Sequence, residues 1–107
     1  MSRSESLAAY LRAEAWRRLD RVETLDRGRN ARCALALLDA AAYAGSLADD
    51  DALIVGLAEA GCFGPHAAGP FEPGASGIEV IRSWESGEPW QLLLAIRAAA
   101  RNALKRA

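Results

Sequence analysis

The side chains best suited to chemistry in this sequence are a thiol and an imidazole four residues apart, Cys62 and His66. Such a pair could help to bind a metal or act as nucleophile and base. A structural zinc site needs four ligands in closely spaced pairs, however, and the second cysteine, Cys33, lies in a distant apolar segment. Spacing alone also sets no catalytic geometry in a loop. We therefore expect no metal ion and no catalytic residues. A small-molecule pocket around Cys62, His66 and Trp84 is kept as an alternative.

Carboxylates are the next candidates. The acidic run 49–51 is followed directly by the apolar residues 52–55, whereas a calcium loop spreads its oxygen ligands over twelve positions and ends on Glu. We interpret the run as a helix cap with acids in the first turn. Asp39 is the one charge in the apolar stretch 33–44, and we expect it to meet water or an Arg. No phosphate-binding Gly loop is present, so we expect no cofactor.

Composition narrows the class of protein. The 107 residues are 51% hydrophobic and 25% charged, which is typical of one globular domain with one core. Two cysteines are too few for a disulfide framework. Abundant Ala, with twelve Arg against one Lys, is typical of a bacterial protein from a GC-rich genome. No segment has the roughly 20 apolar residues of a membrane span, and the N-terminus lacks a signal-peptide core. We expect a soluble, cytoplasmic protein that does not bind membranes.

Charge is divided along the chain although the net charge is −1. Residues 1–32 carry a net +3, residues 33–81 carry −7 without a single base, and residues 82–107 carry +3. Acids interleave with the bases at both ends, so no uniformly basic surface for nucleic acid is indicated.

The segment 29–46 predicts the central element of the fold. It is apolar on nearly every side of a helix, which is typical of a buried helix against which amphipathic neighbours pack. Apolar residues spaced by three and four predict a long first helix at 4–25, capped by Ser2 or Ser4. On that helix we expect Glu14 and Arg18 to form a solvent-facing pair.

Three further helices follow from periodicity and capping signals. The pattern Ser76 to Glu79 matches a capping box ahead of an apolar run, and Pro89 suits the first turn of a last helix. The segment 61–77, between the first and second of these helices, holds three of the four Pro and five of the nine Gly, so we expect a loop that Phe63 and Phe71 pin to the core. The expected helices cover residues 51–60, 77–86 and 89–105.

These elements predict an all-α fold, with residues 1–107 forming a single small domain of four or five helices around the central helix at about 29–46. We expect a protein-interaction or regulatory module without catalytic chemistry, whose partner is another protein or a second copy in a homodimer. The candidate interaction residues are Trp90, Trp16, Tyr10 and Phe71. Trp84 is expected in the core, close to Trp90, and Trp90 at the interface.

Two other function classes remain as alternatives. A helix-turn-helix regulator would place Arg side chains of the first or last helix on nucleic-acid phosphates. Its recognition helix would fall near 51–60, however, where residues 49–51 and Glu59 are acidic and no base occurs, which disfavours nucleic acid. A small enzyme or ligand-binding protein, with its pocket near the loop 61–77, comes third.

Overall fold

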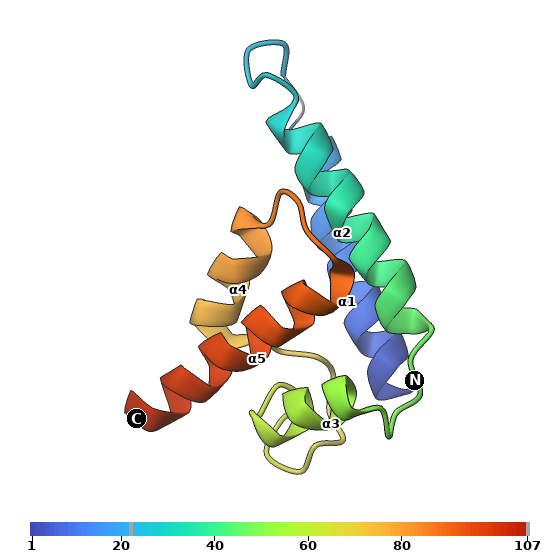
Figure 1. The fold of residues 1–107 in the computed structure, drawn as a ribbon, viewed down its shortest axis with the longest axis vertical. Helices are drawn as coiled ribbons and strands as arrows, with labels where there is room; N and C mark the ends of the chain where they lie inside the picture. The colour runs from blue at the N-terminus through green and yellow to red at the C-terminus, as the bar shows by residue number, and fades with distance from the viewer. Residues whose placement is uncertain (22, 107) are drawn as a thin grey trace.

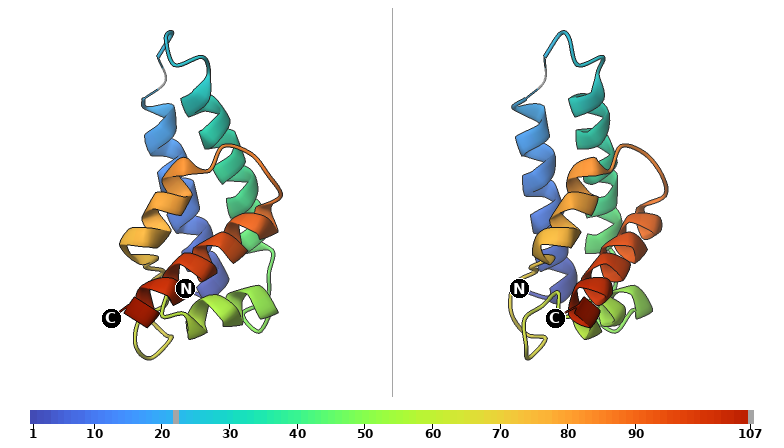
Figure 2. Two further views of the ribbon diagram at one scale, coloured as in Figure 1. Left: turned by 60° about the vertical axis from the view of Figure 1, so that its left-hand side comes forward. Right: turned by 90° about the vertical axis from the view of Figure 1, so that its left-hand side faces the viewer.

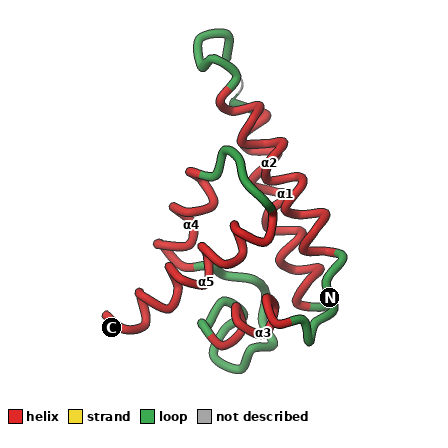
Figure 3. The backbone as a smooth tube through the Cα atoms, in the orientation of Figure 1, coloured by secondary structure: helices red, strands yellow, loops and turns green. Residues whose placement is uncertain are grey.

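Five helices make up the fold in the computed structural model, which describes residues 1–21 and 23–106. The described part contains no strand, so the predicted all-α class is confirmed (Figure 3). The helices are α1 (Arg3–Leu19), α2 (Arg29–Gly45), α3 (Ala52–Glu59), α4 (Gly74–Ser83) and α5 (Pro89–Arg106). No helix in these two ranges is long and apolar enough to cross a membrane.

The helices α1 and α2 form an antiparallel hairpin that is the longest part of the molecule (Figure 1). The helices α4 and α5 lie on one side of this hairpin, and α3 lies near its base (Figures 1 and 2). Residues 23–28, in the turn before α2, stand clear of the other elements in all three views. The rest of the described chain therefore covers one side of the hairpin and leaves the opposite side open.

The core lies between the hairpin and the other three helices. Phe63 and Phe71 are 0% and 3% exposed, so the loop between α3 and α4 is pinned to the core as predicted. Their rings lie 5.6 Å apart. The largest core side chains that are at most 1% exposed come from every helix and from this loop: Leu7, Leu11, Leu37, Ile54, Leu57, Phe63, Ile81, Leu92, Leu93 and Ile96.

The first helix ends six residues earlier than predicted, at Leu19 instead of residue 25. A polar turn replaces its last turns. The Asp26 carboxylate accepts hydrogen bonds from the backbone N–H of Gly28 and from the side-chain amide of Asn30, and that amide also donates to the Arg21 carbonyl. Asp side chains favour such local turns over helix. Val22, which belongs to the predicted stripe, falls outside the described residues, and Leu25 is 90% exposed.

The fourth helix begins and ends earlier than predicted. It covers Gly74–Ser83, so Ser76 lies inside the helix and the capping box is wrong. Pro73 is the N-cap residue and makes no side-chain capping hydrogen bond. Gly77, one turn later, lies directly against Pro73, because a Cβ at Gly77 would come within 2.7 Å of the proline Cβ. The Ser76 signal is therefore not the one that starts this helix.

The second helix packs against α1, α4 and α5, but it is not buried on all sides as predicted. Leu35 is 62% exposed and Asp39 is exposed on the same side. The buried residues of α2 occupy the other side: Cys33, Ala34, Leu37, Ala40, Ala41 and Ala44. The expectation that Asp39 meets water is confirmed.

Candidate functional site

The hairpin has two unlike faces because successive helical residues differ by about 100°. Glu14 of α1 and Leu37 of α2 are 5% and 1% exposed and belong to the covered side. Trp16 and Leu35, each two residues away from one of these, point about 200° around their helices and are 58% and 62% exposed. Both therefore project from the side that α4 and α5 leave open.

Smaller apolar side chains join these two into one surface. Leu19 and Leu38 are half-buried between the two helices and touch the core from this side. On α2, the apolar positions of this side are spaced by four, three and four residues. We call this surface the outer hairpin face, and it consists of Trp16, Leu19, Ala31, Leu35, Leu38 and Ala42.

Charged side chains border the outer hairpin face on α2. Arg32 and Asp39 are exposed, three residues before and four residues after Leu35. The Arg32 guanidinium donates to the Arg27 carbonyl at 2.7 Å and lies 3.8 Å from the Glu85 carboxylate. A guanidinium has five N–H donors, so Arg32 keeps the capacity for further contacts.

The base of the hairpin is held by hydrogen bonds across the chain. The Asp49 carboxylate accepts from the backbone N–H groups of Arg3 and Ser4, both at 3.1 Å, and so caps α1 from the loop before α3. These bonds to backbone N–H groups lower the pKa of Asp49 below its ordinary value. The predicted caps also form, since Ser2 accepts from the N–H of Glu5 and Asp51 from that of Leu53.

Glu14 is the one buried acid of the described residues, and its position contradicts the predicted solvent-facing pair with Arg18. Its carboxylate instead lies 2.8 Å from the Arg17 guanidinium and 3.9 Å from that of Arg82 on α4. Arg18 donates to the Arg82 carbonyl and to the Asn30 side chain. Glu14 therefore joins the inner side of the hairpin to α4, which the spacing within one helix could not indicate.

The four predicted interaction residues do not form one surface. Phe71 is in the core, 3% exposed, and half-buried Tyr10 packs on it with ring centroids 5.2 Å apart. The pKa of the Tyr10 hydroxyl is raised mainly by burial and, to a smaller extent, by the negative charge of Glu14. Trp16 belongs to the outer hairpin face, and Trp90, 43% exposed, lies separately at the start of α5.

The predicted closeness of Trp84 and Trp90 is not seen, because no ring pair joins them within residues 1–21 and 23–106. Trp84 is half-buried against the core, in line with its predicted role, and its indole lies over Gly87. A Cβ at Gly87 would come within 2.9 Å of the indole. The indole N–H is buried without a hydrogen-bond partner in the described part of the chain.

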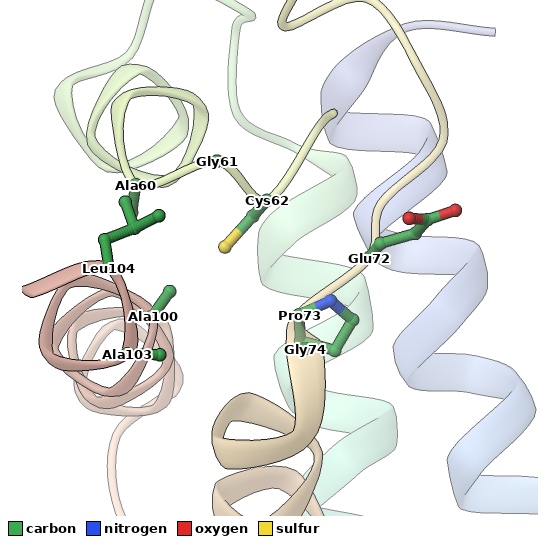
Figure 4. Close-up of a pocket in the computed structure, with 9 residues that line it drawn as sticks. All are labelled: Ala60, Gly61, Cys62, Glu72, Pro73, Gly74, Ala100, Ala103 and Leu104. Carbon is green, nitrogen blue, oxygen red and sulfur yellow. The ribbon is translucent and has the colours of Figure 1, made fainter. Parts of the chain in front are cut away.

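The structure separates the predicted pocket residues. Cys62 is 1% exposed, whereas His66 is exposed and Trp84 lies on a different element. Cys62 lines a cavity of about 190 Å³, with its sulfur directed toward α5 and the Glu72 carboxylate pointing away (Figure 4). Ligand pockets usually measure about 300–1,000 Å³. The cavity is lined by Ala60, Gly61, Cys62, Glu72, Pro73, Gly74, Ala100, Ala103 and Leu104.

Burial also makes the thiol unreactive, since it raises the pKa of Cys62 to about 11. The thiol therefore stays protonated at neutral pH and is a poor nucleophile and metal ligand. Among the residues that the structure describes, no three His, Cys, Asp or Glu side chains are grouped to hold a metal ion.

The sequence analysis named only Trp16 of the outer hairpin face and missed Leu35, its other largely exposed residue, and it placed Glu14 in solvent. The heptad-like spacing from Ala31 to Ala42 was a signal for Leu35, because it marks a second apolar stripe on a helix whose first stripe is the core. The sequence holds no comparable signal for Glu14. Comparison of the chain with protein-family models, with curated proteins and with solved structures found no match.

Proposed function

We propose that this chain is a protein-interaction module, without catalytic chemistry of its own, that binds its partner through the outer hairpin face. One observation carries the proposal: Trp16 and Leu35 are more than half exposed on neighbouring helices, on a side that no other element of the described chain covers. Isolated exposed apolar side chains are ordinary on protein surfaces. A contiguous apolar face on two helices is typical of an interaction site.

The residue types support binding in preference to chemistry. Tryptophan is among the residues most enriched in binding hot spots. The thiol of Cys62 is protonated and enclosed, and His66 lies apart from it. Around α3, the acids Asp49, Asp50 and Glu59 would repel phosphates, which favours a protein partner over nucleic acid. Trp90 lies outside this face, so its predicted contact with a partner has to be tested separately, with a variant at position 90.

Site-specific photo-crosslinking in the source cells tests the proposal. A photoreactive benzoylphenylalanine replaces Leu35, and the matched control carries it at Leu104, an exposed leucine of α5 with nearly the same exposed fraction, 57%. We expect a discrete protein adduct from position 35 that disappears when Trp16 is also changed to Ser. Adducts that form equally at both positions, or only at 104, would contradict the outer hairpin face as the binding surface.

A further inference from the structure

We infer that the occupant of the outer hairpin face is a second copy of this chain, packed antiparallel about a two-fold axis. The inference rests on the proposed function, because it names the partner of the same face. It depends on three features of the hairpin: the positions of Trp16 and Leu35 along the helix axes, the order of the charged residues along α2, and the area of the uncovered side.

The two exposed side chains lie within about 3 Å of the same level along the hairpin. At the base, Gly45 of α2 lies against Ala8 of α1. The helices run antiparallel with the same rise, so each step forward along α1 matches one step back along α2. Eight steps bring Trp16 level with Leu37, two residues from Leu35.

This level matters because two-fold interfaces are self-complementary. Consider a two-fold axis that lies in the plane of the interface and runs across both helices at this level, at right angles to them. Such an axis places Trp16 against the partner's Trp16. The same axis places Leu35 against the partner's Leu35 and runs each α2 antiparallel to the other. One symmetry operation thus covers both exposed side chains.

The charges on α2 fit the same arrangement. Arg32 and Asp39 have opposite sign and lie on either side of a centre between Leu35 and Ala36. In an antiparallel pair about that centre, Arg32 faces the partner's Asp39, and the contact occurs twice. A parallel pair would place like charges together. Exposed ion pairs add little affinity, but they select orientation.

The open side is small for a stable dimer. Helices of 17 residues are about 25 Å long, and two side by side present about 500 Å² per copy. Stable dimers bury about 800 Å² per partner or more. We therefore expect reversible dimerisation that depends on protein concentration.

Sedimentation equilibrium of the full chain over a wide concentration range tests the inference. Wild type should pass from monomer to dimer, whereas Trp16→Ser combined with Leu35→Ser should stay monomeric with an unchanged circular dichroism spectrum. The matched control, Leu25→Ser combined with Leu104→Ser, removes two exposed leucines outside the face and should dimerise like wild type. A dimer that survives the first double variant would overturn the inference.

A charge exchange tests the orientation. Asp39→Arg alone places Arg against Arg, and Arg32→Asp alone places Asp against Asp, so each should weaken dimerisation about tenfold. An equal mixture of the two variants makes both contacts complementary and should restore a dimer that contains one copy of each. Failure of the mixture to associate would overturn the antiparallel register.

The outcomes also separate this inference from the proposed function. If wild type stays monomeric at every concentration, self-association is wrong. An adduct with a different protein from position 35 in cells would then leave the proposed function standing. If neither dimer nor adduct forms, both are wrong.

Discussion

The α1/α2 hairpin has an inner face, which α4 and α5 cover, and the outer hairpin face. The two faces are built from similar residues but differ in what they contact. Leu37 on the inner face is 1% exposed, whereas Leu35, two residues earlier on the same helix, is 62% exposed. Both faces carry apolar stripes with helical spacing. The difference lies in coverage, because α4, α5 and the loop between α3 and α4 supply partners for one face only (Figure 2). An apolar stripe therefore indicates that a surface needs a partner, and the tertiary structure decides whether the chain supplies it.

The same substitution on the two faces gives the sharpest contrast. Leu37→Ala removes buried methyl groups from the core and should lower the free energy of unfolding by about 2–5 kcal/mol. Leu35→Ala should change it by no more than about 0.5 kcal/mol, since the side chain is largely solvated. Urea unfolding followed by circular dichroism measures both. Equal losses would show that the outer face is covered within the monomer.

Trp84 at the end of α4 and Trp90 at the start of α5 give a second contrast, between a half-buried and an exposed indole. Trp84→Ala empties a half-buried site against the core and should cost about 2–4 kcal/mol of stability. Trp90→Ala should cost less than about 1 kcal/mol, because the indole is 43% exposed. If Trp90 contacts a partner as predicted, benzoylphenylalanine at position 90 should give a protein adduct of its own. An unfolded Trp90→Ala variant, or no adduct from position 90, would contradict that role.

Glu14 tests the polar contact on the inner face. Glu14→Gln removes the charge that lies between Arg17 and Arg82 and should lower the free energy of unfolding by about 1–3 kcal/mol. Glu5→Gln, at an exposed position in the first turn of the same helix, is the control and should cost less than about 1 kcal/mol, because only its interaction with the helix N-terminus is lost. Thermal unfolding at neutral pH measures both. A Glu14→Gln variant as stable as the control would mean that the carboxylate is not needed to join α1 to α4.

The cap at the base should make stability depend on acid. Because the folded pKa of Asp49 lies below its ordinary value of 3.8, its ionised form stabilises the fold at pH above that value. This stabilisation is lost as pH falls through the folded pKa. Asp49→Asn should therefore lower the melting temperature at neutral pH, and the difference from wild type should shrink below pH 4. Asp50→Asn is the matched control, and a difference that persists in acid would exclude the cap as its cause.

The smallest effect is expected on the outer face itself. Asp39→Asn should shift the free energy of unfolding by less than about 0.5 kcal/mol, because the side chain is solvated in the monomer. Its effect should appear in sedimentation as weaker dimerisation. A loss of stability above about 3 kcal/mol would show that Asp39 is buried and paired within the chain.

Much of the fold could be predicted because helical periodicity is a strong local signal. All five helices were expected, and those with clear stripes, such as α2 and α5, were placed within one or two residues. The errors occurred where two local signals compete. The Asp26 turn ends α1 early although the apolar spacing continues to Leu25, and α4 begins at Gly74, ahead of the Ser76 cap. In both places only the structure shows which of the two signals is used.

The candidate site could be predicted only in part. Trp16 and Trp90 were named and are exposed, whereas Phe71 was named and is buried. An aromatic residue type does not distinguish a core position from an interface position, because large apolar side chains are favoured at both. Leu35 was missed since an apolar helix was assumed to be enclosed, and which side of it stays open depends on where the later helices pack.

The first turn of α1 is synthesised before the residues that complete its hydrogen bonds. The backbone N–H groups of Arg3 and Ser4 bond to Asp49, and the side chains of Arg3 and Ser6 bond to the backbone of Ala67 and Phe71. Translation proceeds from the N- to the C-terminus, so a nascent chain exposes this turn well before the ribosome has released those partners. These contacts of the first turn can therefore form only after the middle of the chain has emerged. A ribosome-bound chain that stops before residue 49 should leave its first turn open to proteases and chaperones.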